Sequence, residues 1–315
     1  MRVLITGANG FLGSHLVNTF VKQGHHVIAG VRKNAKLEKL TLDRCELSYL
    51  NYQKVDDLVS SLQDIKKEGD LDLIIHNAAI TVAKHRETFF NINTQLSKKL
   101  FEAIKQSEVL STTGKIAYIS SLAARGPLGK EKAVSAYGES KLATEKILQE
   151  SGFTYLIFRP TGIYGPKDKD FVALFDSCKK GIYPLIGKAS QKISMIHVED
   201  VAQAVFEISG THSNTIAHLS DGHIYSNLDI KKAVDKALGS KSFTLKLPKA
   251  IAIFFVKISS FFSKTPFMTV EKLKEITDNW GYDFAEERKE MPFNIKYNLY
   301  TGIQQTLNYI NSTKK

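Results

Sequence analysis

The first half of the chain alternates short apolar runs with segments of helical periodicity. The apolar runs predict strands at 2–5, 25–31, 45–50, 71–76, 115–120 and 155–159. Between them, apolar residues recur at three- and four-residue spacing, which predicts helices over 11–23, 54–67, 87–109 and 135–150. Strands that alternate with helices in this way indicate an α/β fold with a doubly wound parallel sheet.

The first predicted strand leads directly into a glycine-rich turn. Three glycines are spaced Gly-x-x-Gly-x-x-Gly, and helical spacing begins immediately afterwards. Absent side chains let a phosphate approach the backbone, and the helix N-terminus offers N–H donors and the positive end of its dipole. This order predicts a Rossmann-type dinucleotide site. We expect it to include Gly7, Asn9, Gly10, Phe11, Leu12 and Gly13.

The second predicted strand ends in two basic residues, Arg32 and Lys33. In dinucleotide folds, an acidic residue at this point accepts hydrogen bonds from the adenosine ribose, whereas a positive pair suits a 2′-phosphate. The pair therefore favours NADP(H) over NAD(H). The alternative is that both are exposed loop charges.

The pattern becomes less regular after residue 166. Shorter strands are predicted at 182–185, 192–197 and 215–219. We therefore expect a dinucleotide-binding domain over 1–166, joined by returning elements at about 192–220. The rest of 167–315 is expected to form a smaller, interleaved lobe that mainly binds substrate.

The composition is ordinary for a globular protein, but the charge is strongly positive. Of 315 residues, 43% are hydrophobic and 24% charged, and the formal net charge is +11. Such a surface favours a phosphorylated cofactor, an anionic membrane or nucleic acid. Nucleic acid is not expected, because no zinc-finger spacing, RNA-binding signature or dense basic run occurs. Two cysteines and no secretory leader predict a reduced, cytoplasmic protein, and no residue spacing predicts a metal site.

Tyr137 and Lys141 form a second informative pattern. Residues four apart share a helix face, so the lysine ammonium could approach the phenol and lower the pKa of Tyr137 from about 10 towards the working pH. No other tyrosine in the chain has a lysine four positions later. Ser121, at the end of the fifth predicted strand, is the expected third member and would orient a substrate oxygen. Ser120 is the alternative, though it is more typical of a buried strand-end hydroxyl.

Together these pieces resemble a known family. The segments TGANGFLG (6–13), HNAA (76–79), SS (120–121), YGESK (137–141), RPTGIYGP (159–166) and HVEDVA (197–202) are similar, in order, to motifs of extended short-chain dehydrogenase/reductases of the NAD-dependent epimerase/dehydratase superfamily. The resemblance implies that Ser121, Tyr137 and Lys141 are catalytic. It also implies that further cofactor contacts come from Ala78, Ala79, Asn93, Tyr137, Lys141, Pro160, Thr161, Gly162 and Ile163.

Two positions depart from that family's pattern. Asn51 stands where members usually carry an acidic residue that touches adenine, so the adenine end is expected to be held differently. Ile193 stands where nucleotide-sugar enzymes have an arginine that clamps phosphates. An aliphatic side chain cannot replace a bidentate phosphate clamp, although the adjacent Lys192 could partly substitute. A nucleotide-sugar substrate is therefore disfavoured, but it is not excluded.

A strongly apolar helix is predicted over 248–262. The region resembles the C-terminal lobe of dihydroflavonol-reductase-like and 3β-hydroxysteroid-dehydrogenase-like members, which implies an apolar small-molecule substrate. The helix could instead pack on the core or in a homodimer, and its flanking lysines leave peripheral membrane contact open. In family members, dimers form through helices that correspond to 87–109 and 135–150.

Three functional hypotheses remain. The first is an NAD(P)-dependent oxidoreductase that transfers a hydride between nicotinamide and a carbonyl or secondary alcohol through Ser121, Tyr137 and Lys141. The second is a sugar or nucleotide-sugar epimerase/dehydratase that uses the same three residues. The third is a non-catalytic cofactor-binding protein with the same fold.

Overall fold

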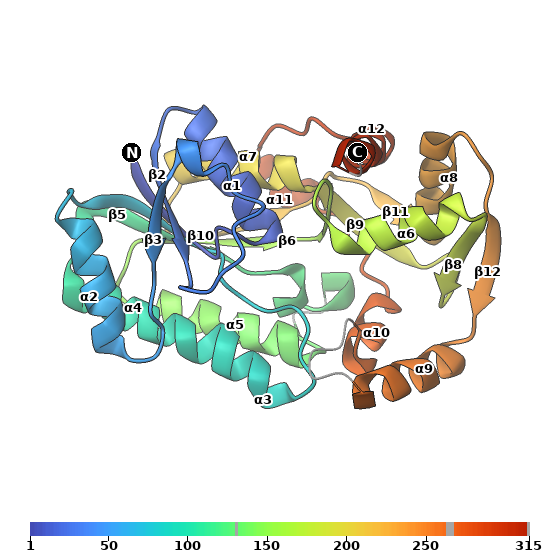
Figure 1. Ribbon diagram of the computed structural model, residues 1–315, viewed down its shortest axis with the longest axis horizontal. Helices are drawn as coiled ribbons and strands as arrows, with labels where there is room; N and C mark the ends of the chain where they lie inside the picture. Colours follow the sequence, from blue (N-terminus) through green and yellow to red (C-terminus); the bar gives the residue numbers. More distant parts are fainter. Residues whose placement is uncertain (130–131, 263–267, 314–315) are drawn as a thin grey trace.

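The computed structural model describes residues 1–129, 132–262 and 268–313, and its centre is a parallel sheet (Figure 1). The seven strands follow the order β10-β6-β5-β4-β1-β2-β3. Their bounds are β1 (Arg2–Thr6), β2 (His26–Val31), β3 (Glu46–Tyr49), β4 (Leu71–His76), β5 (Leu110–Ile119), β6 (Tyr155–Pro160) and β10 (Thr215–Leu219). This is the doubly wound order of a Rossmann-type fold, so the predicted fold class is confirmed.

Helices cover both faces of this sheet. One face carries α1 (Phe11–Lys22) and α7 (Val198–Thr211); the other carries α2 (Val55–Lys66), α4 (Leu96–Ser107) and α5 (Ala136–Gln149). In β1, Val3 and Ile5 pack into the core beneath the first pair, whereas Leu4 packs into the core on the other face. The strand is buried on both sides, which explains its continuous apolar sequence.

The helix predicted over 87–109 is divided into three parts. It consists of α3 (Arg86–Phe89), the π-helical segment η2 (Phe90–Gln95) and α4. The Asn93 side chain accepts a hydrogen bond from the Ile80 N–H at 2.9 Å and donates to the Ile80 carbonyl oxygen at 3.1 Å. These two bonds tie the wider turn to the loop after β4. Hydrophobic spacing could not show the change, because the helical direction continues through it.

The smaller lobe contains two further sheets, which lie to the right in Figure 1. One has the order β11 (Ile224–Ser226), β9 (Lys192–His197), β7 (Gly162–Tyr164); the other pairs β8 (Ile182–Ile186) with β12 (Phe243–Leu247). The lobe's helices are α6 (Lys169–Lys179), α8 (Asn227–Leu238), α9 (Lys249–Phe262), α10 (Val270–Ile276) and α12 (Leu299–Thr313), whereas α11 (Ala285–Glu290) contacts β10 of the large sheet. Short 3₁₀ segments are η1 (Leu42–Arg44), η3 (Leu122–Ala124) and η4 (Pro127–Gly129).

The chain passes repeatedly between the two lobes. Within 192–220, β10 is the edge strand of the large sheet and α7 packs on that sheet, whereas β9 pairs with β7 in the smaller lobe. Because β7 follows directly after β6, this lobe stands at the carboxyl edge of the large sheet, where doubly wound folds bind ligands. In the part of the chain that the structure describes, no helix has the length and apolarity needed to span a membrane.

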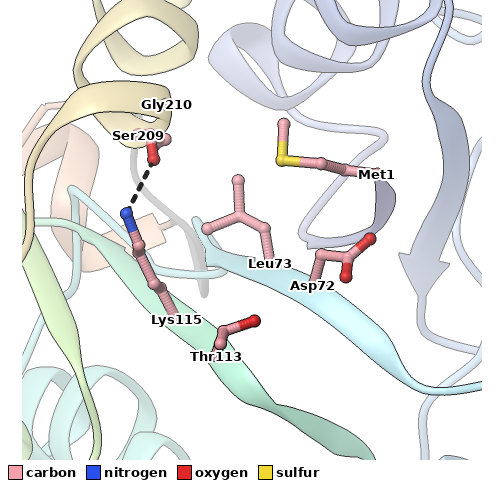
Figure 2. A pocket seen from close by; sticks show the side chains of 7 residues that line it. All are labelled: Met1, Asp72, Leu73, Thr113, Lys115, Ser209 and Gly210. Atoms are coloured by element: carbon pink, nitrogen blue, oxygen red, sulfur yellow. Dashed lines mark hydrogen bonds between the residues drawn. The ribbon is translucent and has the colours of Figure 1, made fainter.

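A cavity of about 270 Å³ lies at the opposite, amino-terminal edge of the large sheet (Figure 2). Lys115 on β5 donates hydrogen bonds there to the carbonyl oxygens of Ser209, at 3.2 Å, and His212, at 2.8 Å. The Lys115 ammonium therefore joins β5 to the end of α7. The cavity is lined by Met1, Asp72, Leu73, Thr113, Lys115, Ser209 and Gly210, none of which is a predicted site residue.

Candidate active site

The glycine turn after β1 is packed too closely for side chains. Gly7 has a φ of +64°, and a Cβ there would lie 2.8 Å from the Ala78 Cα. A Cβ on Gly13 would lie 2.1 Å from the Gly7 carbonyl oxygen. Helix α1 can approach the turn this closely only because position 13 has no side chain. The turn and the loop after β4 are therefore held side by side.

The first turn of α1 is open to an anion. Gly10 is the N-cap, no side chain caps the helix, and no acidic residue lies in its first turn. A Cβ on Gly10 would meet only the Gly7 oxygen within 4 Å, at 3.1 Å. A helix N-terminus without a capping partner leaves N–H donors for a ligand, and a phosphate fits this site by charge and by shape. Beside this turn, the Asn9 side-chain amide donates a hydrogen bond to the Lys36 carbonyl oxygen at 3.0 Å.

The loop after β4 forms the neighbouring wall. The Thr6 hydroxyl accepts hydrogen bonds from the N–H groups of Asn77 and Ala78, each at 3.2 Å, and Ala79 is exposed. His76 is buried between Thr6 Oγ1, at 2.8 Å, and Ser97 Oγ, at 2.7 Å. Burial lowers the pKa of His76 to about 3, so the ring is neutral and has a structural role.

Asn93, a predicted cofactor contact, is engaged by the protein itself. Its side chain is 1% exposed, and its amide bonds to the Ile80 backbone and, at 3.0 Å, to Ser140 Oγ. These bonds join the loop after β4 to α5, and a contact between Asn93 and the cofactor stays a prediction.

The segment from Pro160 to Ile163 contains a buried polar atom without a partner. Thr161 Oγ1 is buried and makes no hydrogen bond to the described residues. The Thr161 backbone N–H is used by the Leu219 carbonyl oxygen at 2.9 Å, and Gly162 is exposed. An unpaired buried hydroxyl is costly unless a ligand satisfies it. The position is compatible with the predicted nicotinamide end of the site.

The predicted adenosine end is exposed. Arg32 and Lys33 follow β2 with exposed side chains, and among the described residues neither has an ion-pair partner. Asn51 is also exposed, and its Oδ1 accepts a hydrogen bond from the Gln53 N–H at 3.1 Å. The two cations are therefore accessible to an anionic group.

Ser121 and Tyr137 are brought together from two different elements. Ser121 follows β5, and its hydroxyl accepts a hydrogen bond from the Ala123 N–H at 3.1 Å, which starts η3. Ser135 caps α5 by accepting from the Gly138 N–H at 3.1 Å, so Tyr137 stands in the first turn of that helix. The Ser121 hydroxyl lies near the Tyr137 phenol and acts to lower the pKa of that phenol.

Lys141 lies one turn further along α5 and is 2% exposed. Its ammonium donates to the Ile119 carbonyl oxygen at 2.6 Å and lies 4.7 Å from the centroid of the Tyr118 ring. Desolvation lowers the pKa of Lys141 to about 7, and the Glu145 carboxylate partly opposes this change. The amine is therefore poised between its charged and neutral forms near neutral pH.

The pKa of Tyr137 is raised in this structure, whereas the spacing predicted that Lys141 would lower it. Desolvation is the main cause and the Glu275 carboxylate the second, while the Ser121 hydroxyl acts in the opposite direction. Lys141 does not offset this rise in the pKa of Tyr137, because its ammonium donates a hydrogen bond to the Ile119 carbonyl and is itself desolvated.

Ser120 belongs to a separate buried cluster. Its hydroxyl donates to the Glu145 carboxylate, which also accepts hydrogen bonds from Arg159 at 3.0 and 2.6 Å. Glu145 is 1% exposed. With its hydroxyl engaged behind the strand end, Ser120 is a structural residue, and the geometry favours Ser121 as the group that meets a substrate.

Helix α10 supplies residues that the sequence patterns did not identify. The Ala136 N–H donates to a carboxylate oxygen of Glu271, and Lys272 Nζ lies 5.9 Å from the centroid of the Tyr137 ring. The Glu275 side chain is 10% exposed, and burial raises its pKa. More than 130 positions separate α10 from Tyr137, so no local pattern could have revealed the contact.

Ile193 lies in the smaller lobe and packs on the core of that lobe. Ile193 in β9 pairs with Tyr225 of β11 and bridges to Trp280, and its side chain packs on the lobe's core. Lys192, beside it, is exposed. The Ile193 side chain therefore contributes to the packing of the smaller lobe.

The sheet order and the glycine turn define a Rossmann-type dinucleotide-binding fold. Residues 3–217 match the model of the NAD dependent epimerase/dehydratase family, and the chain belongs to that family. The resemblance inferred from the motifs is thus confirmed. The relatives include reductases, dehydrogenases and epimerases, so the chain is an enzyme of this family.

Two curated relatives and one solved structure illustrate the range of proteins to which this chain is similar. A ceramide reductase of Caulobacter vibrioides is 28% identical over 257 residues, covering 78% of this chain and 73% of its own length. A decarboxylating sterol-4-alpha-carboxylate 3-dehydrogenase of Candida albicans is 24% identical and covers 98% of this chain and 97% of its own. The crystal structure of dTDP-glucose 4,6-dehydratase from Bacillus anthracis, in complex with NAD, superposes with a TM-score of 0.78 at 17% identity. The superposition covers 100% of this chain and 97% of the dehydratase chain, and at this low identity it shows a shared fold only.

Proposed function

We propose that this protein is an NADP(H)-dependent oxidoreductase that interconverts a carbonyl and a secondary alcohol on an apolar small molecule. The observation that carries the proposal is the closeness of the Ser121 hydroxyl to the Tyr137 phenol, with Lys141 buried one helical turn away. A binding module would have no need of this arrangement at the carboxyl edge of the sheet. Two relatives named for ceramide and sterol substrates support an apolar substrate.

The chain's own residues can hold the substrate and move its proton. The nicotinamide, when bound, would supply or accept the hydride. In reduction, the Ser121 hydroxyl donates a hydrogen bond to the carbonyl oxygen, and the Tyr137 phenol gives that oxygen its proton. Lys141 stands one turn away, and its amine donates to the Ile119 carbonyl oxygen in this structure. The first turn of α1 would hold the pyrophosphate, and the Thr161 hydroxyl is available at the nicotinamide end.

The preference for NADP(H) rests on Arg32 and Lys33. Both are exposed and without carboxylate partners among the described residues, so they can contact a 2′-phosphate. Arg32→Ala should weaken NADPH binding about tenfold or more while changing NADH binding little, because a charged hydrogen bond to phosphate contributes about 1.5–3 kcal/mol. Titration of cofactor fluorescence measures both. If Arg32→Ala weakens NADH binding as much as NADPH binding, the basis for the proposed NADP(H) preference is removed.

The chemistry is tested by NADPH consumption with a panel of apolar ketones and aldehydes. Tyr137→Phe should reduce turnover at least 100-fold while leaving the dissociation constant for NADPH within about twofold, because only the proton donor is lost. Tyr155→Phe, which removes a hydroxyl remote from the site, serves as the control. If Tyr137→Phe retains full activity, the proposed role of the tyrosine is wrong.

An epimerase remains the second candidate, since a UDP-glucose 4-epimerase of Vibrio cholerae is 22% identical over 96% of this chain. Ile193 argues against it, because it supplies no cation for a sugar-nucleotide phosphate. An epimerase would interconvert UDP-sugars without net NADPH consumption. A non-catalytic protein would bind the cofactor and show neither activity.

A further inference from the structure

Helix α9 presents an apolar stripe that is exposed in the part of the chain that the structure describes. Ile251, Phe254 and Phe255 follow the i, i+3, i+4 spacing of one helix face, and their side chains are 44%, 60% and 60% exposed. Ala252, on another face of the helix, is 3% exposed and packs towards the protein. The strand that precedes α9 continues the pattern, because Phe243 of β12 is 73% exposed. Two adjacent phenylalanines that are more than half exposed mark an interaction surface.

Negative charge is excluded from this part of the sequence. No aspartate or glutamate occurs between Asp235 and Glu271, whereas the chain as a whole has 32 acidic residues in 315. The same run contains six lysines. Among them, Lys241, Lys246, Lys249 and Lys257 have exposed side chains next to the apolar stripe. The partner must therefore be apolar in its interior and negatively charged at its surface.

We propose that α9 binds the surface of a lipid bilayer that contains anionic lipids. The helix has 14 residues, and no helix in the described residues is suited to crossing a membrane, so it would lie in the plane of the interface. Phenylalanine and isoleucine side chains then enter the acyl boundary, while lysines reach the lipid phosphates. A protein partner would need acidic groups arranged to match, but a bilayer satisfies both conditions along its whole surface.

The proposed lipid-binding helix is connected to the catalytic helix. Helix α9 packs against α10, whose Glu271 carboxylate accepts a hydrogen bond from Ala136 at the start of α5. Figure 1 shows α10 between α9 and the end of α5. If the proposed function holds, an apolar carbonyl dissolved in the bilayer would be close to Tyr137. The membrane contact itself does not depend on that chemistry.

Vesicle sedimentation tests the proposal without any substrate. The full-length protein is mixed with vesicles of phosphatidylcholine alone, or of phosphatidylcholine with 30% phosphatidylglycerol, in about 0.1 M salt. We expect binding to the anionic vesicles that is at least tenfold stronger than to neutral ones and that weakens at 0.5 M salt. Lys249→Glu/Lys257→Glu should reduce binding about 30-fold or more. Phe254→Ala/Phe255→Ala should reduce it at least tenfold.

Matched variants elsewhere on the molecule serve as controls. Lys22→Glu/Lys105→Glu makes the same charge change on exposed residues of α1 and α4, and Leu42→Ala/Tyr49→Ala removes exposed apolar side chains near β3. Both controls should bind as the wild type does.

Three results would overturn the proposal. The first is equal binding to neutral and anionic vesicles. The second is binding that neither α9 variant reduces. The third is a dimer in sedimentation velocity that Phe254→Ala/Phe255→Ala converts to a monomer while vesicle binding is unchanged, since a second copy of the chain would then cover the stripe. NADPH turnover with a water-soluble carbonyl, measured on the same variants, shows separately whether the catalytic proposal holds.

Discussion

Replacing Lys141 by methionine should make the protein less active but relatively more stable at low pH. The lysine is 2% exposed, and desolvation places its pKa at about 7, against 10.5 for the ordinary side chain. Folding therefore opposes protonation of this amine. Methionine has a similar length and no titrating group, so it removes that opposition.

The size and sign follow from the two pKa values. Between pH 7 and 10.5 the unfolded chain binds more protons at this residue than the folded chain does, so stability rises with pH across that window. Below pH 7 the full shift costs about 5 kcal/mol. From pH 6 to pH 9 the wild type should gain about 3 kcal/mol relative to Lys141→Met. Loss of the hydrogen bond to the Ile119 carbonyl costs the variant a further 1–3 kcal/mol, roughly, but that cost is the same at every pH.

Urea unfolding at pH 6, 7, 8 and 9, without cofactor, measures this difference. Lys146→Met is the matched control, because Lys146 is exposed on the same helix, and its stability should run parallel to that of the wild type. If the wild type and Lys141→Met show the same pH dependence from 6 to 9, Lys141 does not titrate in this range. The assignment of a poised amine would then be wrong.

Two further substitutions test the glycine turn and α10. Gly13→Ala should lower the free energy of unfolding by about 1–3 kcal/mol and abolish NADPH binding, because a Cβ would lie 2.1 Å from a carbonyl oxygen. Gly210→Ala, on a helix where a Cβ meets nothing within 4 Å, should leave stability unchanged or raise it in the same urea assay. Glu275→Gln should lower the pKa of Tyr137 and move the rise of alcohol oxidation with pH downward by about one unit, since a nearby negative charge is removed. An unchanged pH profile would show that Glu275 does not act on the tyrosine.

Most of the main sheet could be predicted from local sequence, because its strands are buried on both faces. The predicted strand at 71–76 matches β4, Leu71–His76, residue for residue. Its continuous apolar pattern belongs to a strand with cores on both sides. The glycine turn could also be predicted, since Gly10 and Gly13 are required by close contacts with Gly7, a few residues away.

The site was less predictable where it depends on contacts between distant elements. The pattern placed Asn93 along the cofactor, but the amide is engaged by Ile80 through a π-helical turn that hydrophobic spacing cannot reveal. The pattern also placed the Lys141 ammonium beside the Tyr137 phenol. Helical spacing brings the two side chains to one face, but it does not describe the Ile119 carbonyl that binds the amine.

The protonation of Tyr137 depends on its burial and on a carboxylate from a distant part of the sequence. Burial lowers the pKa of Lys141, on the same helix as Tyr137, to about 7, while Glu275 belongs to α10 and raises the pKa of the phenol. The same short helix is tied to α5 through Glu271 and packs against α9. Helix α10, a segment of seven residues, therefore contacts both α9 and the helix that carries Tyr137.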